Sequence, residues 1–227
     1  MDEELAAVLA LMPDEHKVVV AGREFWQGHL HGHEVVAVLA RIGKVAAATT
    51  AAVLIERFQV GHIVFTGVAG GLGPGVQVGD VVVASEFLQH DMDASPIFPR
   101  HQVPLYGRSR FPSDPAMAEA LCEAARRALP QASVHQGLVI SGDRFVSTTA
   151  EAQALQAELP EALAVEMEGA AFAQVCHDFG VPFAAVRTIS DRADDSASVD
   201  FADFVRNVAS RYAQQILTGF LQRLPQR

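Results

Sequence analysis

Short runs rich in valine and isoleucine alternate with segments of helical periodicity along almost the whole sequence. The β-branched runs predict strands, because such side chains fit the pleated, half-buried surface of a sheet. These runs are residues 18–21, 35–40, 62–67, 80–87, 134–141 and 183–190. The periodic segments predict helices over residues 44–58, 114–129, 150–159, 166–179 and 200–224. Strands that alternate with helices in this way are typical of an α/β domain.

The stretch between the first two predicted strands, residues 27–33, predicts a hairpin with its turn at His31–Gly32. Antiparallel pairing there makes the expected sheet mixed, so we expect a three-layer α/β/α domain around a central mixed sheet. Residues 91–112 contain four prolines and show no period, which predicts a long ordered excursion. The sequence has no repeats and no linker of flexible composition, so residues 1–227 are expected to form one domain.

Charge and hydropathy exclude several classes of protein. The chain has 17 Lys and Arg against 27 Asp and Glu, a formal charge of −10 with the basic residues scattered, which does not suit binding to nucleic-acid phosphates. No apolar run approaches the ~20 residues of a membrane span, and residues 2–4 are acidic where a signal peptide is basic. Cys122 and Cys176 lie in separate apolar patterns and are expected to be buried free thiols. We therefore expect a cytoplasmic protein without nucleic-acid or membrane partners.

Six glycines fall between positions 67 and 79, at and after the end of a predicted strand. Glycines at the carboxyl end of a strand let a ligand approach the backbone closely, but a run of tight turns explains them equally well. Their spacing does not match a dinucleotide-binding fingerprint, and residues 42–44 lack the flanking residues of a phosphate-binding loop. The glycines therefore mark a candidate ligand site without identifying the ligand.

Two carboxylates, Glu166 and Glu168, stand where an apolar run becomes an apolar helix. Glu168 is expected near a helix N-terminus, whose dipole favours the ionised form, and an ionised carboxylate there accepts hydrogen bonds from a pair of sugar hydroxyls. Helix capping by acidic residues is the alternative explanation. The apolar setting favours the binding role, because a merely solvated charge does not fit there.

Asp191 follows Ser190 at the end of the last predicted strand, and the ligands of open α/β sheets lie at strand ends. Desolvation raises the pKa of a partly buried carboxyl, which then carries a proton near neutral pH. Such a group suits a general acid, which accelerates a reaction by about 10²–10⁴-fold. An Asp-capped turn is the alternative explanation.

The remaining polar and aromatic patterns are less specific. His29, His31 and His33 alternate along one strand, but no cysteine or aspartate completes a metal site, so structural roles are favoured. Phe145 follows a predicted strand and suits stacking on a flat heterocycle, although a core position is the more frequent outcome. The sequence contains no Gly-x-Ser-x-Gly, no His-Glu-x-x-His and no Cys-x-x-Cys. We expect neither a metal nor an organic cofactor.

In chain order, these stretches resemble the nucleoside phosphorylase/hydrolase superfamily, and within it the bacterial 5′-methylthioadenosine/S-adenosylhomocysteine nucleosidases. The segments that carry the resemblance are residues 1–5, 42–48, 66–71, 78–83, 90–91, 141–145, 165–168 and 186–191. Each is weak alone, but the ordered set is specific. The resemblance implies a nucleoside phosphorylase-like fold. It also implies a hydrolase of methionine salvage that releases adenine from 5′-methylthioadenosine, S-adenosylhomocysteine and, as a further substrate to test, 5′-deoxyadenosine.

The resemblance also implies residue roles. Asp191 would protonate adenine N7, and Glu4, helped by Arg187, would orient and deprotonate the attacking water. Glu168 would accept hydrogen bonds from the ribose hydroxyls, and Phe145 would stack on adenine. The further substrate-binding residues implied in this way are Val146, Met167, Glu166, Val68 and Ser190.

Two features depart from the family pattern. Relatives begin with a β-strand ahead of the segment at residues 1–5, and this sequence begins at Met1. We expect a late start site rather than a natural loss, because removing a buried strand costs more than the ~5–15 kcal/mol that stabilises a domain. Glu4 is then expected on a frayed terminus. Val68 stands where some relatives have serine, which we interpret as variation within the nucleosidases.

Phosphorolysis is the main alternative to hydrolysis within the superfamily, and Phe65 and Val68 bear on the choice. Related phosphorylases look to have arginine and serine or threonine where this sequence has Phe65 and Val68. An apolar pair does not hold a phosphate dianion, so water is the expected nucleophile. A futalosine-type nucleosidase and a catalytically impaired nucleoside-binding protein on the same fold remain alternatives.

The residues around Phe98, Pro104 and Tyr106 are candidates for lining a pocket for the 5′-thio group. In the resembled family, part of this lining comes from a partner subunit. The resemblance therefore implies a homodimer.

Overall fold

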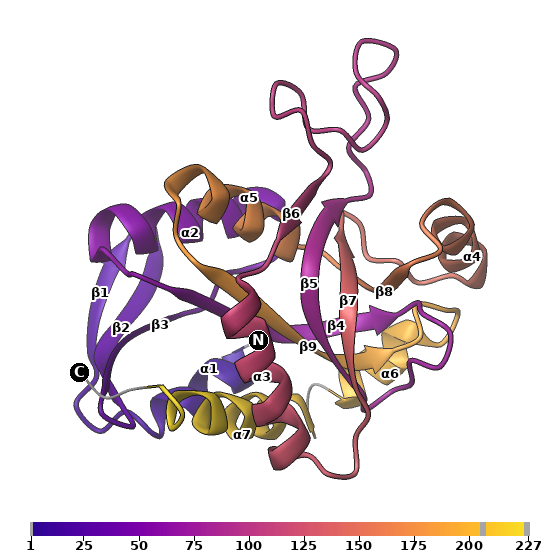
Figure 1. The fold of residues 1–227 in the computed structure, drawn as a ribbon. Helices are drawn as coiled ribbons and strands as arrows, with labels where there is room; N and C mark the ends of the chain where they lie inside the picture. Colours follow the sequence, from indigo (N-terminus) through magenta and orange to yellow (C-terminus); the bar gives the residue numbers. More distant parts are fainter. Residues whose placement is uncertain (1, 205–207, 225–227) are drawn as a thin grey trace.

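The computed structural model of the protein describes residues 2–204 and 208–224 (Figure 1). Its helices are α1 (Asp2–Leu9), α2 (Lys44–Phe58), α3 (Pro115–Ala128), α4 (Thr149–Glu158), α5 (Gly169–Phe179), α6 (Ala197–Phe204) and α7 (Ser210–Leu221). Its strands are β1 (His16–Val20), β2 (Arg23–Leu30), β3 (His33–Val38), β4 (Ile63–Gly71), β5 (Val81–Gln89), β6 (Arg110–Pro112), β7 (Val134–Ser141), β8 (Ala162–Glu166) and β9 (Phe183–Asp191).

The strands form two sheets. β1, β2 and β3 make an antiparallel three-stranded sheet, and the turn between β2 and β3 lies at His31 and Gly32, as predicted. Their φ angles of 50° and 84° suit the tight turn of a hairpin. The other strands pair in the order β6-β5-β7-β8-β4-β9, and an additional pairing of β5 with β9 closes five of them into a ring.

The larger sheet is mixed, as expected, but not for the expected reason. β5 runs parallel to β7 and antiparallel to β6 and β9, and β4 runs parallel to β9 and antiparallel to β8. The prediction that the hairpin makes the central sheet mixed was wrong, because β3 pairs only with β2 among the described residues. Among the described residues, β9 pairs with β4 over most of the length of β4, whereas β8 pairs only with its last two residues, Gly70 and Gly71.

Helices cover both faces of the larger sheet, which confirms the three-layer α/β/α prediction (Figure 1). Alternate residues of a strand point to opposite faces. Val81 and Val83 of β5 accordingly belong to a core with residues of α3 and α7. Val82 of the same strand belongs to a core with residues of α2 and α5. A third, smaller core packs around the carboxyl ends of β5, β7 and β8.

The predicted helix at residues 166–179 is shorter in the structure, and a strand precedes it. β8 pairs with β7 and β4, and α5 begins at Gly169. The Glu166 carboxylate accepts hydrogen bonds from the amides of Glu168 and Gly169, which turns the chain between strand and helix. The alanine and valine residues of β8 suit either element, so their pattern does not predict which one forms.

The other predicted helices differ less from the structure. α2 spans the predicted residues 44–58, and α3 begins after Asp114, whose side chain accepts a hydrogen bond from the Met117 amide. The predicted helix at residues 200–224 is divided into α6 and α7, and its residues 205–207 lie outside the described part of the chain.

Between β5 and β6 the chain projects beyond the sheet (Figure 1), and residues 110–112 of the predicted excursion return to the sheet as β6. This excursion contains a cis peptide bond between Ser95 and Pro96. Glu158 at the end of α4 accepts hydrogen bonds from Arg100 and His101 and so ties the excursion to the domain. The prediction of a long ordered excursion is confirmed.

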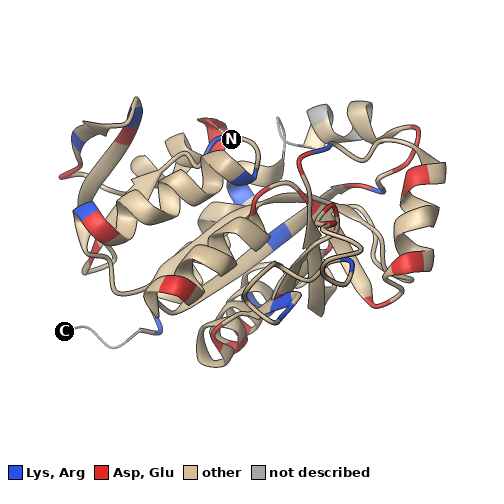
Figure 2. Ribbon diagram, turned by 90° about the horizontal axis from the view of Figure 1, so that it is seen from above, with Lys and Arg blue, Asp and Glu red and all other residues tan. Residues whose placement is uncertain are grey.

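The N-terminal helix is packed rather than frayed. α1 packs against α7, and Glu4 is only 6% exposed, so the expected fraying at Glu4 is not found. Cys122 and Cys176 are buried free thiols, as predicted. In the described part of the chain, no helix is long and apolar enough to cross a membrane. Lys and Arg side chains are interspersed with Asp and Glu over the molecule rather than gathered in one stripe (Figure 2).

The three histidines of the hairpin make separate structural contacts. His29 Nδ1 lies 2.6 Å from Asp14 Oδ2, His31 Nε2 lies 3.2 Å from Thr218 Oγ1, and His33 Nε2 lies 3.0 Å from the Leu221 carbonyl oxygen. The last two contacts hold the hairpin against α7. Within the described residues, no group of three or more potential ligands is arranged to hold a metal ion.

Candidate active site

The carboxyl ends of β4, β8 and β9 meet at a narrow cavity. Five of the predicted site residues line it, and they are Phe145, Val146, Glu166, Met167 and Asp191. The cavity volume of about 20 Å³ holds little more than one water molecule. Phe145 lines the cavity and is 42% exposed, so its side chain has room to move when a larger ligand enters.

Asp191 is fixed at the wall of this cavity, at the end of β9. It is 2% exposed. Its Oδ2 accepts a hydrogen bond from Ser190 Oγ at 2.7 Å, and its Oδ1 accepts one from the Ala193 amide at 2.8 Å. Gly70 on β4 makes room for the carboxyl, since a Cβ at that position would lie 2.9 Å from Asp191 Oδ1. The structure thus holds Asp191 in one orientation beside the space that a ligand would enter.

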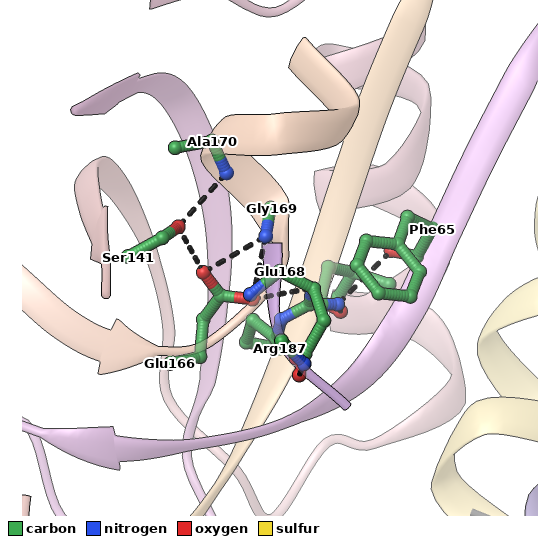
Figure 3. Close-up of polar contacts among 9 residues, drawn as sticks. Phe65, Ser141, Glu166, Glu168, Gly169, Ala170 and Arg187 are labelled. Atoms are coloured by element: carbon green, nitrogen blue, oxygen red, sulfur yellow. Dashed lines mark hydrogen bonds and ion pairs between the residues drawn. The ribbon is translucent and has the colours of Figure 1, made fainter. Parts of the chain in front are cut away.

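Glu166 is held by hydrogen bonds on both carboxylate oxygens (Figure 3). Oε1 accepts from Ser141 Oγ, and both oxygens accept from the Gly169 amide, at 3.0 and 2.8 Å. Oε2 also accepts from Arg187 Nη2 at 2.8 Å. Glu166 therefore caps the start of α5 and neutralises Arg187, so helix capping, the alternative weighed for this carboxylate, is what its contacts show.

Arg187 is 1% exposed and lies between Glu166 and Phe65 (Figure 3). The centre of its guanidinium is 4.0 Å from the centre of the Phe65 ring, which is a cation–π contact. Its charge is thus already compensated inside the protein. This matters for the choice of nucleophile, because an anion would find no uncompensated charge at Arg187.

Glu168 stands at the N-cap of α5, as predicted. Its Oε1 accepts a hydrogen bond from the Gly43 amide at 2.9 Å. Burial and the negative charge of Glu166 raise the pKa of Glu168 to about 7, against the lowering effects of the Gly43 amide and of Arg187. The Glu168 carboxyl is therefore partly protonated near neutral pH, and the expectation that the helix N-terminus keeps it ionised is wrong, because burial and Glu166 outweigh that effect.

The structure does not bring every predicted residue to the cavity wall. Ser190 reaches the site through its hydrogen bond to Asp191. Val68 lies on β4 two residues before Gly70, and Glu4 is buried on α1. Neither of them lines the cavity, and the predicted catalytic residues Glu168 and Arg187 do not line it either. Their roles stay predictions.

Three residues of this region were not predicted from the sequence. Arg144 lines the cavity, and its side chain is 75% exposed and paired with Glu151. Phe201 of α6 lies edge-on to Phe145, with ring centroids 5.8 Å apart. Gly43 contributes its amide to Glu168. Of the three, only Gly43 could have been found from the sequence, because it is a glycine directly before a predicted helix. Nothing in the sequence pattern distinguishes Arg144 or Phe201 as a site residue.

Comparisons with known proteins agree with this geometry. The family model of the phosphorylase superfamily matches residues 1–222 of the chain. Among curated proteins, the 5′-methylthioadenosine/S-adenosylhomocysteine nucleosidase of Geobacillus thermodenitrificans is 38% identical over 222 residues, which cover 96% of this chain and 92% of the relative. The family match assigns the chain to the phosphorylase superfamily, in agreement with its mixed sheet and with the cavity at the strand ends.

Solved structures narrow the class further. The nucleosidase of the same description from Neisseria meningitidis, in complex with methylthio-immucillin-A, has a TM-score of 0.93 at 36% identity and covers 99% of this chain and 96% of its own. An aspartate-to-asparagine mutant of the Helicobacter pylori protein, with 5′-methylthioadenosine in its active site, has a TM-score of 0.91 at 30% identity, with coverages of 99% and 96%. This chain belongs to the 5′-methylthioadenosine/S-adenosylhomocysteine nucleosidase family of the phosphorylase superfamily.

Proposed function

We propose that this protein hydrolyses the N-glycosidic bond of 5′-methylthioadenosine and of S-adenosylhomocysteine and releases adenine. The observation that carries the proposal is the buried, oriented carboxyl of Asp191 at the wall of the cavity that Glu166 and Met167, directly before Glu168, also line. The names of the relatives and the ligands of the solved structures support the substrate class. We extend the proposal to 5′-deoxyadenosine as a further substrate.

The proposed reaction uses each group for one step. Asp191 gives its proton to adenine N7 as the bond between the base and the anomeric carbon breaks, so the bonding electrons leave with a neutral purine. Positive charge then develops on the sugar, and the ionised Glu168 accepts hydrogen bonds from the ribose hydroxyls and stabilises that charge. Phe145 stacks on the base and Met167 packs on the sugar.

Water completes the reaction at the anomeric carbon. In the proposal, Glu4 orients this water and takes its proton as the new carbon–oxygen bond forms. Arg187 assists through the charged pair that it makes with Glu166. Val146, through its backbone, reads the edge of the base. In the proposal, Val68 supplies an apolar side chain where some relatives have the hydroxyl of a serine.

Water is proposed as the nucleophile in place of phosphate. The buried Arg187 is already paired with Glu166, and Phe65 presents an apolar ring to it. Arg144, which lines the cavity, is mostly exposed and paired with Glu151. Burying a phosphate dianion without a free cation is costly, so these contacts favour hydrolysis over phosphorolysis.

We also propose a homodimer. The excursion at residues 91–112 presents Ile97 and Leu105, which are 82% and 92% exposed, and the start of α2 presents Val45, which is 79% exposed. Apolar side chains exposed this far are typical of a surface that another subunit covers. Phe98 and Pro104 are proposed to line the 5′-thio pocket of the partner. Tyr106 hydrogen-bonds to Asp178 of its own chain.

The location and pathway follow as proposals from the same activity. The two unpaired, buried thiols suit a reducing cytoplasm. Release of adenine from a methylthio nucleoside is the step that frees the methylthio sugar for methionine salvage.

The test is incubation of the purified protein with 5′-methylthioadenosine, with and without phosphate, followed by chromatography for free adenine. Adenine release that does not depend on phosphate is the expected result. Release that requires phosphate would make the protein a phosphorylase. Stoichiometric binding of the nucleoside without release of adenine would make it a nucleoside-binding protein, and release of base from futalosine alone would make it a futalosine-type nucleosidase.

A further inference from the structure

The segment that precedes α2 contacts the side chain of Glu168 through a backbone amide. The Gly43 amide donates to Glu168 Oε1 at 2.9 Å. Gly43 has a φ of 92°, a region that glycine adopts without strain, and a Cβ there would lie 3.1 Å from Asp143 Oδ1. The contact therefore requires glycine at this position, and it also requires that the segment be held in place.

Two aspartates from neighbouring strand ends hold the segment. Asp143 Oδ1 accepts a hydrogen bond from the Lys44 amide at 2.7 Å, and the Asp143 amide donates to Asp91 Oδ2 at 2.9 Å. Lys44 Nζ donates to Asp91 Oδ1 at 2.6 Å, and it also donates to Gln89 Oε1 at 3.0 Å. Lys44, Asp91 and Asp143 thus form a closed set of contacts, with each residue bonded to the other two.

The charges within this set support one another. The side chains of Lys44 and Asp91 are 15% and 34% exposed. Burial acts to raise the pKa of Asp91, but the hydrogen bonds from Lys44 and from the Asp143 amide prevail, and the net direction is downward. Asp91 is therefore ionised in the folded protein at neutral pH, so its hydrogen bonds with Lys44 and with the Asp143 amide are charge-assisted.

We propose that Lys44, Asp91 and Asp143 are positioning residues that hold the Gly43 amide against one oxygen of Glu168, so that the carboxylate presents its other oxygen to a sugar hydroxyl. This inference rests on the sugar-binding role proposed above for Glu168. The three residues act through the Gly43 amide rather than through the reacting atoms.

Positively and negatively charged groups both act on Glu168 and together set its pKa, so the proposal can be tested through the pH dependence of activity. Glu166 on β8 raises the pKa of Glu168, whereas Arg187 on β9 and the amides of Gly43 and Met167 lower it. Releasing the Gly43 amide removes one of the lowering contacts, so the pKa of Glu168 rises further. A carboxyl that must be ionised to accept sugar hydroxyls then reaches full activity only at a higher pH.

The experiment compares three variants with the wild type. Asp143→Ala removes the acceptor of the Lys44 amide, whereas Asp143→Asn keeps an oxygen that can accept it. Asp14→Ala is the matched control, because Asp14 Oδ1 also accepts a long-range backbone amide, that of His29 at 2.8 Å, on the distant hairpin. The first readout is the pH dependence of kcat/KM for release of adenine from 5′-methylthioadenosine.

For Asp143→Ala we expect kcat/KM to fall about 3- to 8-fold at pH 6.5 and to approach the wild-type value at pH 8.5, because a rise of half a unit to one unit in the pKa of Glu168 from about 7 reduces the ionised fraction by that factor. Asp143→Asn and Asp14→Ala are expected to keep the wild-type profile. A loss in Asp143→Ala that is equal at every pH would show a general structural defect and overturn the proposal, and so would a wild-type profile.

The second readout does not need turnover. Hydrogen exchange of the Gly43 amide, followed by NMR on the ligand-free protein, is expected to be slow in the wild type and faster in Asp143→Ala. If the wild type releases no adenine, the proposed function fails, while faster exchange in Asp143→Ala still supports the positioning contacts. Equal exchange in both proteins would contradict the positioning role whatever the activity.

Discussion

Nη2 of Arg187 and Oε2 of Glu166 lie 2.8 Å apart in the protein interior, where the two side chains are 1% and 3% exposed. Removing two charges from water is costly, and such a pair persists when further hydrogen bonds satisfy the remaining oxygens. Ser141 and the Gly169 amide supply those bonds. The pair therefore joins β9 to the end of β8, and Glu166 at that end also caps the start of α5.

Glu166→Gln is expected to lower the free energy of unfolding by about 3 kcal/mol, because it leaves the Arg187 guanidinium buried without a countercharge. Urea unfolding followed by circular dichroism measures the change. Glu24→Gln is the control, since Glu24 pairs with Lys17 at 2.7 Å on the surface, where such pairs contribute about 0–1 kcal/mol. Equal losses in the two variants would contradict the structural role assigned to Glu166.

Asp191→Asn is expected to reduce kcat by at least about 10²-fold, because asparagine keeps the shape of the side chain but has no proton to give. Binding of the intact nucleoside should change little, since the asparagine oxygen can accept from the Ala193 amide while its NH2 group donates to Ser190 Oγ, which reverses one of the two contacts. Single-turnover release of adenine and equilibrium binding of 5′-methylthioadenosine measure the two effects separately. A kcat near the wild-type value would identify another group as the proton donor.

Gly70→Ala is expected to reduce kcat by up to about 100-fold, the scale on which misplacing a catalytic group by roughly 1 Å slows a reaction. The new Cβ would lie 2.9 Å from Asp191 Oδ1 and 3.0 Å from the Ala193 Cβ, so the carboxyl has to move. Gly61→Ala is the matched control, because a Cβ at Gly61 meets no atom within 4 Å. Unchanged kcat in a folded Gly70→Ala protein would show that the orientation of Asp191 is not limiting.

Activity and stability are expected to respond to pH in opposite directions. The pKa of Glu168 rises from 4.5 in the unfolded chain to about 7 in the folded protein. Between these values the folded state binds the additional proton, so this group's contribution to stability falls as pH rises from 4.5 to 7. The ionised Glu168 needed for turnover increases over the upper part of the same window.

Urea unfolding and kcat/KM, both measured from pH 5 to pH 8, check this prediction. Glu168→Gln cannot titrate, so the part of the stability slope that belongs to Glu168 should be absent from it. The same slope in Glu168→Gln as in the wild type would assign the effect to other groups.

Much of the architecture could be predicted from the sequence, because alternating β-branched and amphipathic segments determine element type locally. The helix at 44–58 and the strand at 134–141 match the structure residue for residue. β8 was not predicted, since its alanine and valine residues are compatible with a helix and only pairing with β7 and β4 selects the strand. The hairpin of β2 and β3 belongs to a sheet separate from the central one. This could not be predicted, because local sequence patterns do not determine which strands pair.

The site shows the same division. Asp191 and Phe145 could be placed at or after strand ends from the sequence, because the end of a strand follows from its pattern. Glu166 was predicted at the start of a helix, and the strand that it ends was not predicted. The contact of the Gly43 amide with Glu168 joins residues 125 positions apart and uses a backbone group that every residue has. No side-chain pattern predicts such a contact, and the same holds for the meeting of Phe145 with Phe201.

β9 is hydrogen-bonded to β4 on one edge and to β5 on the other, so the backbone that ends in Asp191 is among the last parts of the protein to open. Phe145 and Gly43 belong to connections outside the strands, which open at lower free energy. On gradual heating, affinity for the nucleoside should therefore be lost before the sheet melts. An inactivated sample that is cooled promptly would then recover without having to refold.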